Sequence, residues 1–245
     1  MKTMLFLAAS AAAALSLSSV AAAAPTAAQK AAVADKARPE ADTQRDADRK
    51  PAEMLEFAGV QPGQTVVDLI PGGGYFTRIF AKAVGPKGVV YAAYSPRPGG
   101  GTAAADTLAA DPTYGNIKAV QIAPGKLEVP TPADLVFTAQ NYHDVKNVPN
   151  IDMTAFNKGV YDALKPGGTY VVIDHVANAD AGDATSKLHR IDPAVVRREV
   201  EAAGFKFEGE SKALANPADD HTKGVFDPSL RGKTDQFVYK FRKPE

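Results

Sequence analysis

The chain is 245 residues long, contains no cysteine, and carries 28 basic and 28 acidic side chains, so its formal net charge is zero. The lack of cysteine excludes disulfides, thiolate metal sites, a cysteine nucleophile and a lipid-attachment cysteine. The neutral charge gives no electrostatic case for nucleic acid or an anionic membrane as a partner, and the length is enough for one α/β domain.

The first residues have the parts of a secretory signal peptide. Lys2 supplies a positive charge, residues 4–20 are predominantly apolar, and small residues follow. We expect a signal peptide over residues 1–23 that is cleaved after Ala22 or Ala23. The apolar run is too short and too rich in alanine and serine for a stable transmembrane helix. We therefore predict an exported, periplasmic protein with no membrane association after cleavage.

The residues after the signal peptide predict a leader followed by one domain. Residues 24–45 contain no aromatic side chain, and we interpret them as a flexible leader. The domain is expected over residues 46–245. Pro51 predicts the start of a helix, and Gly59 its end. The charged residues before this helix are interpreted as a solvated cluster: Asp46, Arg49 and Lys50.

The centre of the chain predicts a strand, a helix and a second strand in succession. The β-branched run over residues 65–69 is typical of a buried strand and carries an acid near its carboxyl end, Asp68. Three glycines come next: Gly72, Gly73 and Gly74. A helical apolar pattern runs to Gly85, and residues 88–93 predict the second strand, parallel to the first. The glycines are consistent with two alternatives: close approach of a ligand to the backbone, or a tight βα turn with nothing bound. The position of Asp68 favours the first, because parallel sheets bind ligands at the edge where this residue lies.

The rest of the chain continues this alternation of strands and helices. The apolar patterns predict a helix over 102–110, strands over 117–122 and 133–139, a helix over 150–164, a strand over 169–174, and a helix over 193–203. Residues 205–210 and 236–241 alternate apolar and polar side chains, which predicts an antiparallel pair at a sheet edge.

Polar side chains follow the fourth and fifth predicted strands. Asn141, His143 and Asp144 follow the fourth, and Asp174 and His175 end the fifth. Because parallel strands end at one edge, we expect these side chains near the glycines. A histidine beside an acceptor can act as a general base, and His143 is the candidate. Histidine and aspartate together could also bind a divalent metal, but no ligand spacing such as HxH or HExxH is present, so no metal site is predicted.

The segment over residues 216–233 is polar, punctuated by proline and glycine, and long for a connection between edge strands. Such loops are more often lids or binding segments than filler. We predict that this segment meets the ends of the fourth and fifth strands and brings His221 over the glycine loop; a surface loop packed elsewhere is the alternative. His189 is a further candidate whose place in space the sequence does not give.

Four ordered segments resemble the motifs of the class I S-adenosylmethionine-dependent methyltransferases: VVDLIPGGGYFTR, ADLVFTAQNYHD, LKPGGTYVVIDH and EAAGFKFEGES. The resemblance covers residues 52–241. It implies an α/β, Rossmann-like class I methyltransferase fold, with a mostly parallel seven-stranded sheet, an antiparallel edge hairpin and helices on both faces. More narrowly, the tail over residues 216–237, NPADDHTK…FDP…GKTDQF, resembles that of a group of predicted bacterial methyltransferases with signal peptides.

The resemblance implies S-adenosyl-L-methionine as cofactor and methyl transfer to an unknown small-molecule substrate. The positions that correspond to cofactor-binding ones are Asp68, Gly72, Gly73, Gly74, Tyr94, Asn141 and Tyr142. The candidate catalytic residues are His143, Asp144, Asp174, His175 and His221.

Two positions depart from the family pattern. Ile70 stands in place of the first glycine, and Tyr94 stands where the family has an acid that binds the ribose hydroxyls. These departures and the signal peptide leave an alternative open: an exported protein that keeps the fold, has lost the cofactor, and binds a small ligand.

Overall fold

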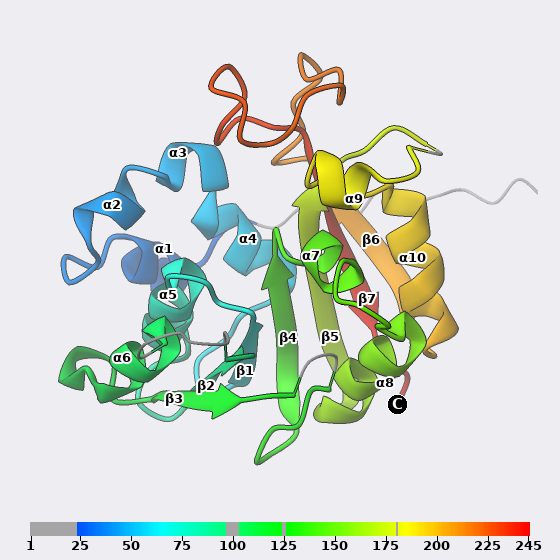
Figure 1. The fold of residues 1–245 in the computed structure, drawn as a ribbon. Coiled ribbons are helices and arrows are strands. Elements are labelled where there is room, and N and C mark those ends of the chain that lie inside the picture. The colour runs from blue at the N-terminus through cyan, green and yellow to red at the C-terminus, as the bar shows by residue number, and fades with distance from the viewer. Residues whose placement is uncertain (1–23, 97–102, 124–125, 180) are drawn as a thin grey trace, which may run out of the picture.

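The computed structural model describes residues 24–96, 103–123, 126–179 and 181–245. The predicted signal peptide, residues 1–23, lies outside these ranges. The strands are β1 (Thr65–Leu69), β2 (Val89–Tyr94), β3 (Ile117–Gln121), β4 (Ala133–Ala139), β5 (Leu164–His175), β6 (Lys206–Ser211) and β7 (Gln236–Arg242). They form one seven-stranded sheet in the order β3-β2-β1-β4-β5-β7-β6 (Figure 1). The first five are parallel, and β7 is antiparallel to β5 and β6, which confirms the predicted sheet and edge hairpin.

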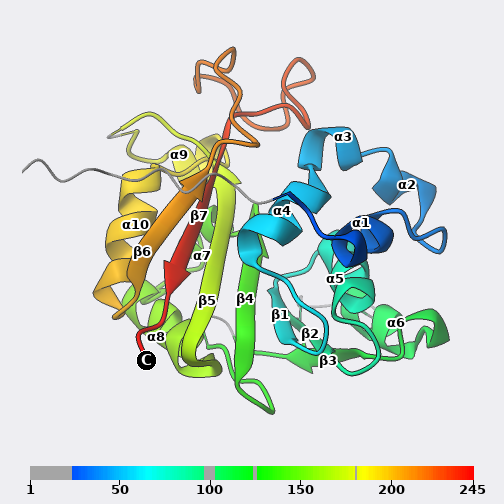
Figure 2. The same cartoon turned by 180° about the vertical axis from the view of Figure 1, so that it is seen from behind.

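Helices cover both faces of the sheet (Figures 1 and 2). They are α1 (Ala27–Val33), α2 (Glu40–Thr43), α3 (Asp46–Arg49), α4 (Pro51–Ala58), α5 (Tyr75–Val84), α6 (Ala104–Ala110), α7 (Tyr142–Lys146), α8 (Met153–Ala163), α9 (Ala184–Lys187) and α10 (Pro193–Ala202), with a 3₁₀ turn, η1 (Pro112–Tyr114). Alternate strand residues point to opposite faces. Val66 therefore packs in the apolar cluster under α1, α4, α5 and α6, and Val67 in the cluster under α7, α8 and α10.

Two of the predicted helices begin at aspartate caps; the cap at Asp192 was predicted, whereas α8 begins at Met153 and not at residue 150. The Asp192 carboxylate accepts a hydrogen bond from the Ala194 amide, and Pro193 takes the first helical position of α10. The Asp152 carboxylate accepts from the amides of Thr154 and Ala155 and sets the start of α8. Each cap satisfies amides that the helix itself leaves free.

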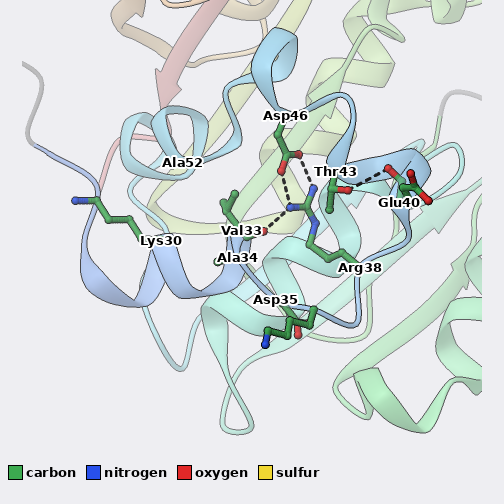
Figure 3. Close-up of a pocket in the computed structure, with 10 residues that line it drawn as sticks. Lys30, Val33, Ala34, Asp35, Arg38, Glu40, Thr43, Asp46 and Ala52 are labelled. Atoms are coloured by element: carbon green, nitrogen blue, oxygen red, sulfur yellow. Dashed lines mark hydrogen bonds and ion pairs between the residues drawn. The ribbon is translucent and has the colours of Figure 1, made fainter.

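The N-terminal segment over residues 24–45 corrects the prediction of a flexible leader. It forms α1 and α2, and α1 packs against α5 and α4. Gln29 is 2% exposed, and its Nε2 donates to the carbonyls of Leu55 and Val60. Figure 3 shows Arg38 pointing to Asp46, with which it makes a two-fold hydrogen-bonded ion pair at 2.8 and 2.6 Å. Small alanine side chains and specific polar contacts replace the large apolar residues that a sequence pattern would detect.

The strand directions bring several loops to one edge of the sheet. β1, β4 and β5 all end at the upper edge in Figure 1, where α3 and α7 lie. Because β7 runs opposite to β5, the connection from β6 to β7 also reaches this edge. None of the helices in the described part of the chain is long and apolar enough to cross a membrane.

Candidate functional site

The glycine loop between β1 and α5 takes a left-handed backbone at three positions. The φ angles are +59° at Ile70, +56° at Gly72 and +82° at Gly74. Ile70 thus adopts a conformation that costs a β-branched residue free energy and that glycine takes freely. Two hydrogen bonds hold it there: its amide donates to the Ala93 carbonyl at 2.8 Å, and its carbonyl accepts from Asn141 Nδ2 at 2.9 Å.

A cavity of about 210 Å³ lies beside this loop. Its lining comes from α2, α3, the start of α5, the ends of β1 and β4, and the loop itself: Asp42, Arg45, Arg49, Asp68, Ile70, Pro71, Gly72, Gly73, Tyr75, Phe76, Ala139, Gln140 and Asn141. A Cβ added to Gly72 or Gly73 would meet no atom within 4 Å. A side chain at either position would therefore enter open space that a ligand can use.

Asp68 is one of the two carboxylates that line this cavity, with Asp42. It is 4% exposed, and one of its carboxylate oxygens accepts a hydrogen bond from the Thr77 hydroxyl at 2.6 Å. Burial raises the pKa of Asp68 to about 6, although the Thr77 hydrogen bond and the charge of Arg49 oppose the rise. A bound cationic group would favour the ionised carboxylate.

The positive charges of the cavity come from Arg45 and Arg49, and the structure corrects the interpretation of Arg49 as a solvated residue. Its guanidinium lies over the rings of Tyr75 and Phe76, 4.5 and 4.8 Å from their centres. Burial, followed by the charge of Arg45, lowers the pKa of Arg49 to about 10, so it stays charged at neutral pH. The docking of α3 against α5 creates this contact, and no local pattern signals it.

The end of β2 gains a carboxylate from a neighbouring helix. The Tyr94 hydroxyl donates to Asp106 Oδ2 at 2.7 Å. Asp106 lies on α6, two residues before Leu108, which covers Gly74. An acid therefore stands beside the position where the family resemblance expects one, but it comes from another element.

The ends of β4 and β5 are joined through Asp174. Its side chain is fully buried; Oδ2 accepts from the His143 amide at 2.8 Å, and Oδ1 lies 2.7 Å from His143 Nδ1. Oδ1 also accepts from the His175 amide at 2.8 Å. On its other side, His143 Nε2 lies 3.2 Å from Asp144 Oδ1. The structure thus brings together four of the predicted catalytic residues.

One of the two buried histidines, His143, is charged, and the other, His175, is neutral. Burial by itself lowers the pKa of His143, but its hydrogen bonds to Asp144 and Asp174 outweigh this and raise the pKa to about 9. Burial lowers the pKa of His175 to about 4. In the ligand-free protein at neutral pH, His143 therefore carries a proton on both ring nitrogens and is charged, and His175 is neutral. This charge state differs from the neutral ring that a general base at His143 requires.

Of the predicted site residues, Asp68, Gly72, Gly73 and Asn141 line the cavity, and the group around His143 and Asp174 lies outside its lining. Tyr142 and His221 belong to separate parts of the structure. The hydroxyl of Tyr142 donates to Glu199 and accepts from Asn157, on the face of the sheet that α8 and α10 cover. His221 Nε2 lies 2.9 Å from Asp235 Oδ2, within the β6–β7 connection. Both are held in other hydrogen-bond networks.

The β6–β7 connection lies at the predicted edge, above the upper ends of β5 and β7 (Figures 1 and 2). His175 Nδ1 lies 2.7 Å from the Thr234 hydroxyl, so the connection meets the end of β5. The lining of the glycine-loop cavity, taken over the described residues, includes none of residues 212–235. The predicted convergence therefore extends to the sheet edge and stops short of the cavity.

No protein-family model matches the chain, and no curated protein matches it. Solved structures do. An S-adenosylmethionine-dependent methyltransferase from Aquifex aeolicus is 19% identical, with a TM-score of 0.61 over 83% of this chain and 95% of that one. An arsenic(III) S-adenosylmethionine methyltransferase from Chlamydomonas reinhardtii is 21% identical, with a TM-score of 0.53 over 91% and 75%. A TehB-like methyltransferase from Corynebacterium glutamicum is 15% identical, with a TM-score of 0.52 over 78% and 85%. At these identities the likeness concerns architecture, and the chain has the fold of the S-adenosylmethionine-dependent class I methyltransferases.

Proposed function

We propose that this protein is an S-adenosylmethionine-dependent methyltransferase that acts on a small molecule. The observation that carries the proposal is the cavity at the glycine loop, where a carboxylate, a guanidinium and open glycine backbone face one space. The fold of the solved methyltransferases supports the same assignment.

The residues of the cavity fit the amino-acid end of this cofactor. Its amino-acid end carries an ammonium and a carboxylate, which match the charges of Asp68 and Arg49. Gly72 and Gly73 allow close approach because their backbone lacks side chains. Outside the lining of this cavity, Asp106 places a carboxylate beside the end of β2, where the family has the acid that binds the ribose hydroxyls. The cofactor, when bound, supplies a sulfonium-linked methyl group to the acceptor.

Calorimetric titration of the mature protein with S-adenosylmethionine and S-adenosylhomocysteine tests this proposal. We expect both to bind, and we expect Arg49→Met to weaken both by about 10–150-fold, because a charge-assisted hydrogen bond contributes about 1.5–3 kcal/mol. Methionine keeps the packing on Tyr75 and Phe76. Arg198→Met, which removes an exposed arginine from α10, is the matched control and should bind as the wild type does. If the wild type binds neither compound, the alternative of a small-ligand-binding protein without the cofactor takes the place of this proposal.

We also infer that the protein is exported and periplasmic, as the group of signal-peptide-bearing predicted methyltransferases would be. The charged, apolar and small-residue parts of residues 1–23 support this. N-terminal sequencing of the periplasmic fraction should give a chain that starts at Ala23 or Ala24. An uncleaved chain in the membrane fraction would contradict it.

A further inference from the structure

Three side chains with metal-ligand chemistry meet at the carboxyl edge of the sheet, outside the glycine-loop cavity. His143 and Asp144 lie on α7, and His189 lies just after α9. Asp144 Oδ1 is 3.2 Å from His143 Nε2 and 3.4 Å from His189 Nδ1. One ligand atom from each of the three lies within 4.8 Å of the others.

These separations match a common coordination centre. Zinc binds histidine nitrogen and carboxylate oxygen at about 2.0–2.2 Å. Two ligands on adjacent corners of such a tetrahedron lie about 3.4 Å apart, by simple geometry from those bond lengths. Both distances from Asp144 agree with this value, and the ligand atoms of the third pair lie within 4.8 Å of each other.

The ring of His143 is already oriented for coordination. Its Nδ1 lies 2.7 Å from the fully buried Asp174 carboxylate, and its backbone amide donates to the same group. The hydrogen bond to Asp174 occupies Nδ1–H, and Nε2 points to Asp144. A carboxylate on the far nitrogen of a ligating histidine is the usual outer-shell partner in metal sites, where it fixes the tautomer and the ring orientation.

His189 is also held in place, at a cost in backbone free energy. Its φ is +54°, a left-handed conformation that non-glycine residues adopt when surrounding structure imposes it. The next residue, Arg190, is fully buried and makes an ion pair with Asp219 at 2.9 Å. The His189 ring packs edge-on against Phe226 and against His143, with ring centres 4.9 and 5.4 Å away.

We propose that His143, Asp144 and His189 form a site for one divalent transition-metal ion of borderline softness, of which Zn²⁺ is the representative. Two imidazoles and one carboxylate suit such ions better than Mg²⁺ or Ca²⁺, which prefer oxygen ligands. The side chains of Asp144 and His189 are 53% and 35% exposed, so solvent reaches the site and a fourth position stays open.

Metal binding to the tag-free mature protein tests the site without any methyl donor, so its outcome is separate from that of the proposed methyl transfer. After treatment with a chelator, calorimetric titration with Zn²⁺ should show one equivalent bound per chain, and Co²⁺ should give visible d–d absorption. Mg²⁺ at the same concentration should give no binding heat. Zn²⁺ should also raise the thermal midpoint in proportion to its binding.

His189→Ala and Asp144→Ala should each weaken Zn²⁺ binding by at least the roughly 10–100-fold that loss of even an outer-shell partner causes. Both residues are partly exposed, so these variants are expected to fold, as unchanged far-UV circular dichroism would verify. His221→Asn is the matched control: it removes a histidine from the same edge and should bind Zn²⁺ as the wild type does. The proposal is overturned if the wild type binds no Zn²⁺ at 100-fold molar excess, if either alanine variant retains wild-type affinity, or if His221→Asn weakens binding as much as they do.

Discussion

Alanine substitutions in the glycine loop should lower the free energy of unfolding in a fixed order. At Gly74, φ is +82°, and an added Cβ would lie 2.1 Å from Leu108 Cδ1. The left-handed backbone costs a residue with a Cβ about 1–2 kcal/mol, and forcing a buried leucine aside costs about 1–3 kcal/mol more. Gly74→Ala should therefore destabilise by about 2–5 kcal/mol.

The two neighbouring glycines separate these contributions. Gly72 has a positive φ of +56° but open space around its Cβ position, so Gly72→Ala should cost only the backbone part, about 1–2 kcal/mol. Gly73 has neither a clash nor a positive φ, so Gly73→Ala should change stability by less than about 0.5 kcal/mol. Yet its methyl group would enter the cavity, so we expect weaker binding of S-adenosylhomocysteine.

Urea unfolding of the three variants and the wild type, followed by circular dichroism, measures this order. The denaturant dependence m should stay constant, so that shifts of the midpoint report stability alone. If Gly74→Ala unfolds at the same urea concentration as Gly73→Ala, then Leu108 does not pack over the loop as described. If Gly73→Ala binds ligand as well as the wild type does, the open space beside the loop is not a binding site.

Two further predictions concern buried charges. Burial raises the pKa of Asp68 to about 6, above the ordinary value near 3.9, so its contribution to stability is present below pH 4 and is lost as the pH rises through 6. In urea unfolding across pH 4–8, the free energy of unfolding of the wild type should fall by about 3 kcal/mol relative to that of Asp68→Asn. Parallel pH profiles of the two proteins would contradict the raised pKa of Asp68. Arg190→Met should lower the free energy of unfolding by about 3–5 kcal/mol, because Asp219 would keep a buried charge without its ion pair. The same urea assay measures this loss, with the exposed Arg198→Met as control. Equal urea midpoints for the two variants would refute the prediction.

The strands and main helices could be predicted because their signals are local. The run over residues 65–69, the cap at Asp192, and the alternation over 236–241 each depend on neighbours within a few positions. The helices over residues 27–43 could not be predicted, because they are short and rich in alanine and charged residues. Distant contacts stabilise them, such as the hydrogen bonds from Gln29 to the carbonyls of Leu55 and Val60.

The candidate site was predictable as far as topology determines it. Parallel strands end at one edge, so the meeting of His143 with Asp174 followed from their positions after β4 and β5. Arg49 and His189 did not follow. Arg49 reaches the cavity through helix docking, and His189 is placed by an ion pair between Arg190 and Asp219, which are 29 residues apart. Metal-ligand spacing in the sequence cannot reveal ligands drawn from two separate segments.

The walls of the cavity at the glycine loop come from segments that lie far apart in the sequence. Arg45 and Arg49 come first, the loop at Ile70 follows, and residues 139–141 come last. During synthesis or refolding, the pocket cannot exist until β4 has inserted beside β1 and the N-terminal helices have docked, because each supplies one wall. Ligand binding therefore requires that folding is complete. A bound ligand should slow hydrogen exchange at the N-terminal helices as strongly as at the loop itself.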